Sequence, residues 1–596
     1  MRKLLHILVL IIGLPLSLSA AGAAVTIDTP MDPPYWALIE RQLLEANADA
    51  VAEWAEKYLD DRGYLEITPR WGGLDGPDDA TENFYNWPLL HALGASNHVL
   101  AIYKKAWEGH LRQFTEAKTE VISLAKDGMY HKEFITTFDW EHTGEGLQSF
   151  FYQALSDPYD PRFQARMRRF AGFYMNEDPG APNYDPKHKI IRSFFNGSKG
   201  PLLRDATPAE WSGDPMTKFG DQHNASTYPE MLAHFAEYTN IVGDSPQNLC
   251  ATSMAMNAYM IEHEAKYKDW LLEYVDAWLD RTRANGNNIP SVIGLDGTIG
   301  GGWDGKWYGG VYGWGFSPFD PAHGRRADRN TVYRGLRVGF LNALLMTGDH
   351  KYVDVIRKQM DNIFAAKKVE NGVTMYPSMY GDQGWYGYRE DPPSHVLLDV
   401  YLATLAPADR ERLPTDDWLR FLDGGDPAFP ETVLRRDLGN IRRRLEQMRQ
   451  DPTTPDTRYT DDIQRYNPAS TDNLVKLMLG GNPAGKTSNM LHSQLRYFDP
   501  VERRAGLPAD VAALVGKISS AGVEVTLVNI NPVSARRVIV QSGAYAEHRC
   551  TKVLAGSSET AVNDSSFEVR LAPGAGAKLV IGMERYANQP TLAHPY

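Results

Sequence analysis

Two segments of this chain, NAYMIEHEAKYKDWLLEYVDAW (Asn257–Trp278) and NALLMTGDHKYVDVIRKQMDNI (Asn342–Ile363), share one pattern. Both open with Asn-Ala, and Lys-Tyr follows at the same offset in each. A short polar turn separates two stretches whose apolar residues recur at helical spacing. A looser copy, FFYQALSDPYDPRFQARMRRFAGFYM, starts at Phe150. The repeat predicts helical hairpins in series, which bury their apolar faces by stacking on their neighbours.

The helical pattern extends from about Pro34 to Gln450 and includes a long amphipathic stretch at Trp36–Leu59. Long loops rich in Gly, Pro and aromatic residues interrupt it, at residues 70–87, 176–228, 291–329 and 371–393. Loops of that length inside a compact domain are usually functional, and the aromatic content argues against disorder. Their unequal lengths also argue against a regular open solenoid.

The C-terminal part has a different composition. Short β-rich runs, including GVEVTLVNINP from Gly522 and RRVIVQSG from Arg536, are bounded by Gly, Pro and Asn. Such runs predict a small antiparallel β-sandwich. We therefore expect a signal peptide at residues 1–23, a helical catalytic domain at 24–465, and a β-sandwich domain with its connector at 466–596. The basic run RRDLGNIRRRLEQMRQD within the connector region is interpreted as a solvated helix face.

The helical hairpins, the long Trp/Gly loops and the export signal described below together resemble the (α/α) toroids of carbohydrate-active enzymes, both glycoside hydrolases and polysaccharide lyases. The resemblance covers roughly residues 35–450 and is architectural, with no single family matched motif by motif. It implies a mainly α fold of about six helical hairpins closed into a toroid and followed by the β-domain. It also implies a poly- or oligosaccharide substrate.

Composition and the N-terminus limit the classes of function. The formal net charge of the 596 residues is −13, which argues against a nucleic-acid partner, because such a partner needs a basic surface. Arg2 and Lys3 precede an apolar run and a small-residue site at Ala21–Ala23, the pattern of a secretory signal peptide. The sequence thus predicts a secreted or periplasmic protein with no membrane span after cleavage. Cys250 and Cys550 are expected to be free buried thiols, with a bridge between them as the alternative.

The stretch RWGGLDGPDDATENFYNW (Arg70–Trp87) holds four carboxylates among glycines and aromatic rings. Cleavage of a glycosidic bond needs two carboxyl groups, and crowded acids raise one another's pKa. Alternatively, Asp78 and Asp79 cap the next helix, or the acids hold a structural Ca²⁺. No other cofactor is expected.

A second acidic stretch, FDWEHTGEGLQSFF (Phe138–Phe151), begins a helix. Glu141 and Glu145 share a helix face by their spacing, and two glycines beside them are expected to leave room for a ligand. The alternative is that Asp139 simply benefits from the helix N-terminus. The favoured function is hydrolysis by paired carboxylates. The candidate catalytic acids are Asp75, Asp79, Asp139, Glu141 and Glu145, with His142 as a binding residue.

The stretch GDQHNASTYPE (Gly220–Glu230) supports a different reaction. A His or Tyr base can abstract the proton beside a uronate carboxyl while an amide neutralises that group. His223 and Tyr228, with Asn224, therefore form the alternative of a polysaccharide lyase. Their spacing resembles toroidal lyases only in part, since the tandem Asn-Asn-His pattern is absent.

Two aromatic loops, Gly300–Arg326 and Met379–Asp391, offer stacking surfaces for sugar rings. The alternative is that the rings fill the centre of the barrel. A non-catalytic glycan-binding protein would use these loops alone. The expected substrate-binding residues are Trp71, Trp87, Asn224, Trp303, Trp307, Tyr312, Trp314, Arg325, Trp385 and Arg389.

GGNPAGKT (Gly480–Thr487) matches the letters of a phosphate-binding loop. A functional loop of that type joins a buried parallel strand to a helix, whereas β-rich sequence follows here. We therefore expect no nucleotide site.

Overall fold

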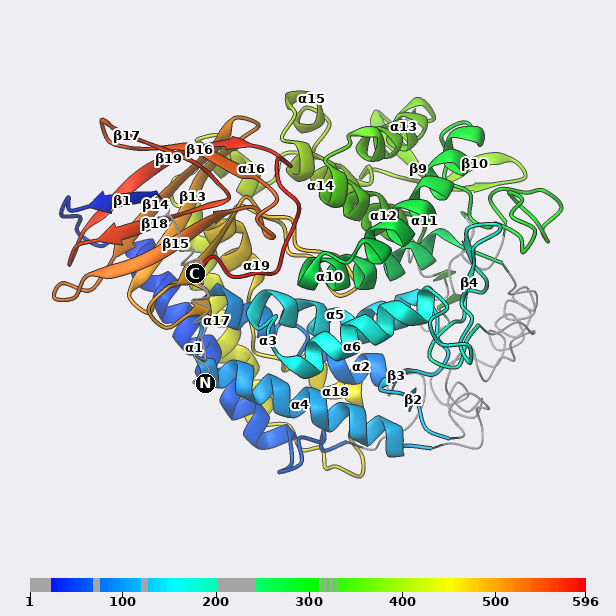
Figure 1. The fold of residues 1–596 in the computed structure, drawn as a ribbon, viewed down its shortest axis with the longest axis horizontal. Helices are drawn as coiled ribbons and strands as arrows, with labels where there is room; N and C mark the ends of the chain where they lie inside the picture. Colours follow the sequence, from blue (N-terminus) through cyan, green and yellow to red (C-terminus); the bar gives the residue numbers. More distant parts are fainter. Residues whose placement is uncertain are drawn as a thin grey trace, which may run out of the picture.

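The computed structural model describes residues 23–67, 76–118, 127–201, 243–309, 314, 319–320, 325–326 and 331–596, with backbone alone at 319–320, 325–326 and Thr331. The expected signal peptide lies outside this part of the chain. Helices dominate up to Gln464, and strands dominate after Leu495 (Figure 1). The main helices are α1 (Tyr35–Tyr58), α2 (Pro77–Glu82), α3 (Trp87–Leu93), α4 (Asn97–Glu116), α5 (Trp140–Ser156), α6 (Pro161–Tyr174), α10 (Thr252–Glu262), α11 (Ala265–Ala284), α12 (Thr331–Thr347), α13 (Lys351–Ala365), α14 (Ser394–Thr404), α16 (Asp417–Leu422) and α17 (Phe429–Arg449).

The three hairpins expected from the repeat are present. They are α5–α6, α10–α11 and α12–α13, and the helices of the second and third pairs pack on each other. The turns use residues that tolerate a left-handed backbone, His263 after α10 (φ 58°) and Gly348 after α12 (φ 69°). Short connections of this kind place consecutive helices antiparallel.

The C-terminal region forms two five-stranded sheets, with orders β1-β18-β15-β11-β12 and β13-β14-β19-β16-β17. The expected antiparallel pairing holds within both, except that β1 pairs parallel with β18. The N-terminal strand therefore belongs to the C-terminal β-region rather than to the helical part. The strands are β1 (Ala24–Ile27), β11 (Leu495–Asp499), β12 (Arg504–Ala505), β13 (Val511–Ser519), β14 (Gly522–Asn529), β15 (Arg536–Ser542), β16 (Arg549–Ala555), β17 (Ser558–Asp564), β18 (Ser566–Leu571) and β19 (Gly576–Glu584).

Residues 371–393, expected as an irregular loop, instead contain most of a three-stranded sheet. It consists of β8 (Lys368–Glu370), β9 (Val373–Gly381) and β10 (Gly384–Arg389), in the order β10-β9-β8. The aromatic residues that suggested a binding loop also favour extended strands, which explains the difference.

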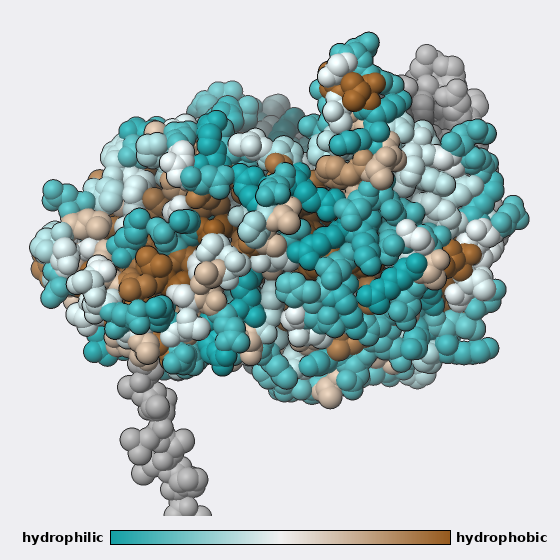
Figure 2. All heavy atoms as spheres, turned by 90° about the horizontal axis from the view of Figure 1, so that it is seen from above, coloured by the Kyte–Doolittle hydropathy of each residue, from teal (hydrophilic) through white to brown (hydrophobic). Residues whose placement is uncertain are grey.

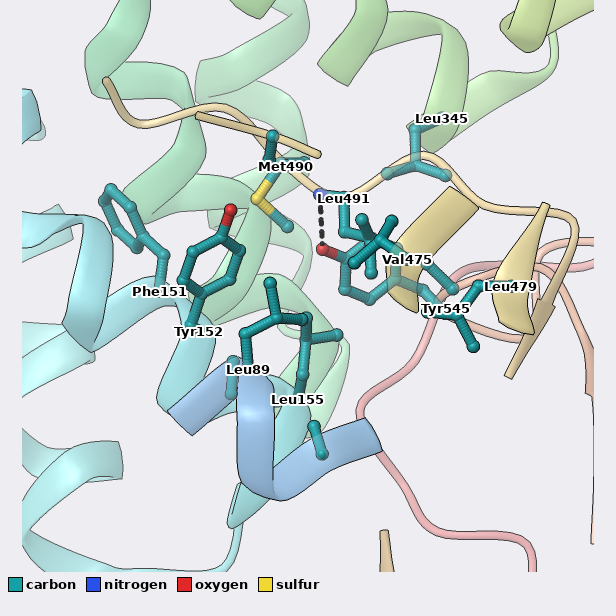
Figure 3. Packing of buried hydrophobic residues seen from close by; sticks show 14 of the residues in the cluster. Leu89, Phe151, Tyr152, Leu155, Leu345, Val475, Leu479, Met490, Leu491 and Tyr545 are labelled. Atoms are coloured by element: carbon teal, nitrogen blue, oxygen red, sulfur yellow. Dashed lines mark hydrogen bonds between the residues drawn. The ribbon is translucent and has the colours of Figure 1, made fainter. Parts of the chain in front are cut away.

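One hydrophobic core joins the helical and β-rich parts (Figure 3). Leu89 of α3, Leu155 of α5 and Leu345 of α12 pack near Leu491 and Tyr545. The Leu491 backbone N–H donates to the Tyr545 hydroxyl at 3.1 Å. The two parts therefore share apolar burial, the main favourable contribution to folding.

The face shown in Figure 2 is mostly hydrophilic, with its largest hydrophobic area toward the β-rich end and smaller ones elsewhere. Within the described ranges, every helix is too short or too polar to cross a bilayer. Both cysteines are buried and free, as expected from the sequence.

Candidate functional site

The first turn of α5 is organised by Asp139, its N-cap residue. The Asp139 Oδ1 atom accepts hydrogen bonds from the backbone N–H groups of Glu141 (2.8 Å) and His142 (3.1 Å). The same oxygen lies 2.8 Å from His142 Nδ1. Asp139 is thus a helix cap, as the alternative reading held, and it also orients the imidazole so that Nε2 remains for other partners.

Adjacent acids of α2 have separate roles. Asp79 Oδ2 accepts the Gly76 backbone N–H at 2.8 Å, which completes a capping interaction at the start of the helix. Asp78 is 2% exposed, and its Oδ1 atom has no hydrogen-bond partner among the described residues. Of the two, Asp79 therefore acts as the cap, and Asp78 is the carboxyl group left for chemistry.

The two glycines of the second acidic stretch allow close packing rather than leaving space. A Cβ atom at Gly146 would lie 3.7 Å from the Asp78 Cα atom, and one at Gly144 would lie 2.7 Å from Ser488 Oγ. Neighbouring segments already occupy the space that we expected a ligand to fill. The close approach brings α2 against α5.

This packing brings together side chains from two segments that are far apart in sequence. Asp78 of α2 and His142 and Glu145 of α5 each offer one oxygen or nitrogen, and these atoms lie within 4.8 Å of one another. His142 and Glu145 are half-buried, and the His142 side chain is 29% exposed. Groups of this kind can transfer protons or bind a cation.

Burial and mutual charge shift the ionisation of the group. Burial raises the pKa of Asp78 to about 7, although the charge of His142 opposes the shift. Burial, together with the Glu141 charge, raises the pKa of Glu145 to about 8. Burial acts against the charge of His142, but the Asp139, Asp78 and Glu145 carboxyl groups together outweigh it, so the pKa of His142 is well above its ordinary value. Burial and the Asp78 charge also raise the pKa of Asp79 well above its usual range.

Two cations border these acids. Arg334, in the first turn of α12, lies 2.8 Å from Glu141 Oε1, so the Glu141 carboxylate is held in an ion pair. Lys486 Nζ lies 2.6 Å from Glu82 Oε2. Asp78 was considered from sequence among the four crowded carboxylates but was not selected as a catalytic acid. Arg334 and Lys486 were missed, since nothing in the local pattern around these two cations indicates their partners.

Lys486 belongs to the stretch that imitates a phosphate-binding loop. Gly480 follows a π-helical turn at Val475–Leu479, and the stretch leads to strand β11 without an intervening helix. The segment packs on α5, where the Tyr152 hydroxyl donates to the Gly485 carbonyl at 3.3 Å. It therefore lacks the strand-to-helix geometry that would bind a phosphate.

Residues of the two aromatic loops come together in the structure. The ring centroids of Trp307 and Tyr380 lie 4.6 Å apart, and those of Trp385 and Trp314 lie 5.3 Å apart. Trp314 is buried and contacts Tyr333, the residue before Arg334. Trp307, Trp385 and Trp303 are half-buried, and Arg389 is exposed.

Trp87 is not available for stacking on a sugar. Its ring is fully buried, contacts Trp54 and Phe84, and donates through Nε1 to Asn467 Oδ1 at 3.1 Å. The proposed subsite residue is a core residue, because α3 turns this face toward α1. Asp75, Trp71, Tyr312, His223, Asn224 and Tyr228 lie outside the described residues, and of Arg325 only the backbone, in the short strand Arg325–Arg326, is described.

Comparison with solved structures gives distant similarities. The "Glycoside hydrolase family 76 (mannosidase) Bt3792 from Bacteroides thetaiotaomicron VPI-5482" is 8% identical with a TM-score of 0.34, covering 73% of this chain and 98% of its own. A "D-mannose isomerase" is 10% identical with a TM-score of 0.36, covering 75% and 100%. "Cellobiose 2-Epimerase from Bacillus thermoamylovorans B4167" is 9% identical with a TM-score of 0.22, covering 58% and 90%. Similarities this distant assign neither a substrate nor a reaction.

No curated protein matches the chain in sequence. A family model does match, over residues 24–374 and 414–475, which is more than half of the chain and includes the helices that carry Asp78, His142 and Glu145. The chain therefore belongs to the family described as "Domain of unknown function (DUF8034)".

Proposed function

We propose that this protein is a glycoside hydrolase in which Asp78 and Glu145 form the catalytic pair of carboxyl groups. One observation carries the proposal: an oxygen of each lies within 4.8 Å of the other, although the residues come from different helices. Retaining glycosidases hold their two carboxyl groups about 5–5.5 Å apart, whereas inverting enzymes need about 6.5–9.5 Å. The separation therefore favours a retaining mechanism.

The surroundings of the two carboxyl groups favour different roles. Burial and the negative charge of Glu141 raise the pKa of Glu145 to about 8, which suits it to donate a proton to the leaving oxygen. Burial raises the pKa of Asp78 to about 7 against the opposing charge of His142, so Asp78 is the carboxyl group of the pair that ionises first and suits attack on the sugar. Asp139 supports this arrangement because it holds the imidazole in place.

The half-buried rings of Trp307, Tyr380 and Trp385 suit a poly- or oligosaccharide, since aromatic faces stack on the apolar faces of sugar rings. This aromatic cluster borders the acids at the first turn of α12. There Tyr333 contacts Trp314, and the next residue, Arg334, pairs with Glu141. The N-terminal signal pattern supports export to the periplasm or outside the cell.

A second candidate is proton abstraction from a sugar, as in a polysaccharide lyase. The Asp139–His142 pair, with Nδ1 and Oδ1 2.8 Å apart, favours it once the imidazole has lost its proton, because the carboxylate then holds one ring nitrogen and leaves the other as a base. Since the pKa of His142 is well above its ordinary value, this reaction should need alkaline pH. The candidate acts through the described His142 rather than through His223 and Tyr228.

A panel of neutral and uronate-containing polysaccharides separates these functions. We expect new reducing ends without the ultraviolet absorbance of an unsaturated product, whereas that absorbance would establish the lyase. Binding without either product would leave only a glycan-binding protein.

Substitution tests the assigned residues on the substrate that the panel identifies. Glu145→Gln and Asp78→Asn should each lower kcat at least about a hundredfold, the usual contribution of a positioned acid or base. Glu56→Gln, an exposed acid of α1, is the matched control and should leave kcat unchanged. Full activity in Glu145→Gln, with a wild-type melting temperature, would refute the assignment.

We also propose that the helical hairpins close into an (α/α) toroid and that the two five-stranded sheets form a sandwich. The serial hairpins around α5 and α12 and the similar strand number of the sheets support these arrangements.

A further inference from the structure

Among the described residues, Asp78, His142 and Glu145 form a set of metal-ligating side chains whose donor atoms lie within 4.8 Å of one another. They come from two helices that pack tightly, so main-chain geometry, not loop conformation, sets their separation. One member is a nitrogen and two are carboxylate oxygens. A set with a nitrogen differs from a simple acidic cluster, which commonly binds nothing.

The His142 imidazole is held by a carboxylate, as the histidine ligands of metal ions commonly are. His142 Nδ1 lies 2.8 Å from Asp139 Oδ1, and that oxygen is itself fixed by two backbone N–H groups of α5. A carboxylate on one ring nitrogen fixes the tautomer and directs the other nitrogen to a metal. In addition, the Asp78 carboxyl is 2% exposed and has one oxygen without a hydrogen-bond partner in the described part of the chain.

We propose that Asp78, His142 and Glu145 bind a divalent transition-metal ion such as Zn²⁺. Bonds from zinc to nitrogen or oxygen are about 2.0–2.2 Å, so two ligands of one tetrahedral ion lie about 3.3–3.6 Å apart. The donors, which lie within 4.8 Å of one another, therefore need to close by at most about 1.5 Å. Imidazole suits Zn²⁺, whereas Ca²⁺ takes six to eight oxygens, so the set favours a transition metal over the structural Ca²⁺ expected for the acidic stretch.

The bound ion has a consequence for the proposed hydrolase, and this consequence alone rests on that function. An ion held by Asp78 and Glu145 occupies both carboxyl groups that hydrolysis needs. Zn²⁺ should therefore inhibit, and a chelator should restore full activity. The binding of the metal itself requires no hydrolysis and is tested independently.

The test measures Zn²⁺ alone on the full chain, freed of metal by a chelator and desalted. Equilibrium dialysis with elemental analysis should give one ion per chain at this site. His142→Gln and Glu145→Gln should each lower the association constant at least about tenfold. Asp139→Asn keeps all three ligands but should lower the association constant about 10- to 100-fold, as the loss of a hydrogen-bond partner that orients a metal ligand typically does.

His98→Gln, a change at an exposed histidine, is the matched control for adventitious surface binding and should leave the association constant unchanged. Circular dichroism of each variant confirms that it folds. Absence of Zn²⁺ binding, or binding that survives both His142→Gln and Glu145→Gln, overturns the proposal. Zn²⁺ binding by a chain that cleaves no glycan when it is free of metal would refute the hydrolase and leave the metal site standing. Cleavage by a chain that binds no Zn²⁺ would do the reverse.

Discussion

At the scale of single residues, two neighbouring carboxyl groups of α2 differ in their contacts. Either Asp78 or Asp79 could cap α2 by its residue type. Only the direction of the chain before the helix decides that Asp79 reaches the Gly76 N–H. The pairing of Lys486 with Glu82 is likewise invisible locally, since 404 positions separate the two. The second acidic stretch was easier to interpret, because Asp139 and His142 interact within one helical turn.

Glu40 provides a test of buried charge away from the site. Its side chain is fully buried in α1, and Oε1 accepts the Ala513 backbone N–H at 3.0 Å. Burial raises its pKa to about 8, so the folded state holds a proton that the unfolded state releases near pH 4.5. Stability from this group is complete below about pH 4.5 and is lost as the pH rises to about 8, at about 1.4 kcal/mol per unit.

Glu40→Gln removes that titration and keeps the hydrogen bond. Urea unfolding should find the variant close to wild type at pH 4.5 and more stable by a few kcal/mol at pH 8. Glu56→Gln is the exposed control and should show the same difference from wild type at both pH values. A Glu40→Gln effect independent of pH would show that the native carboxyl is ionised throughout.

At the scale of elements, short-range periodicity predicts the α10–α11 and α12–α13 hairpins well. Each hairpin forms from adjacent sequence, and its turn residues accept a left-handed backbone. The sheet of β8, β9 and β10 was missed because aromatic residues between glycines suit both a loop and a hairpin. The six-residue helix α2 is too short for a periodic signal, yet it carries Asp78.

The packing of α12 on the segment Pro246–Ala251 supplies an element-scale prediction. A Cβ atom at Gly335 would lie 1.6 Å from the Pro246 carbonyl oxygen, a main-chain atom that cannot move aside freely. Gly335→Ala should therefore lower the free energy of unfolding by at least about 1–3 kcal/mol, as overpacking does.

Gly439→Ala in α17 is the matched control. A Cβ atom there meets nothing within 4 Å, so the change should stabilise by about 0.5–1 kcal/mol through helix propensity alone. Denaturant unfolding measures both variants. Equal effects at the two glycines would contradict the close contact of α12 with Pro246.

At the scale of the whole molecule, strand β1 pairs with the C-terminal β-region, and one core connects the helical and β-rich parts. Strand β1 pairs with β18 in register from Ala24 with Glu568, a long-range pairing that no sequence pattern specifies. The same shared core places the 480–492 segment on α5, so a residue from the beginning of the β-rich region reaches the acids of α2. A site assembled from such distant segments depends on the complete fold. The sequence therefore indicates the two acidic stretches separately, but it does not indicate that Asp78 and Lys486 approach α5.

We propose above that Asp78 and Glu145, each with a carboxyl oxygen within 4.8 Å of the other, act together on a glycosidic bond. The most direct test is the anomeric configuration of the first product, followed by proton NMR during cleavage of the substrate found in the panel. Carboxyl groups this close leave no room for a water molecule between the carboxylate base and the sugar, so we expect retention of configuration. Inversion would contradict it, because that outcome needs a pair about 6.5–9.5 Å apart.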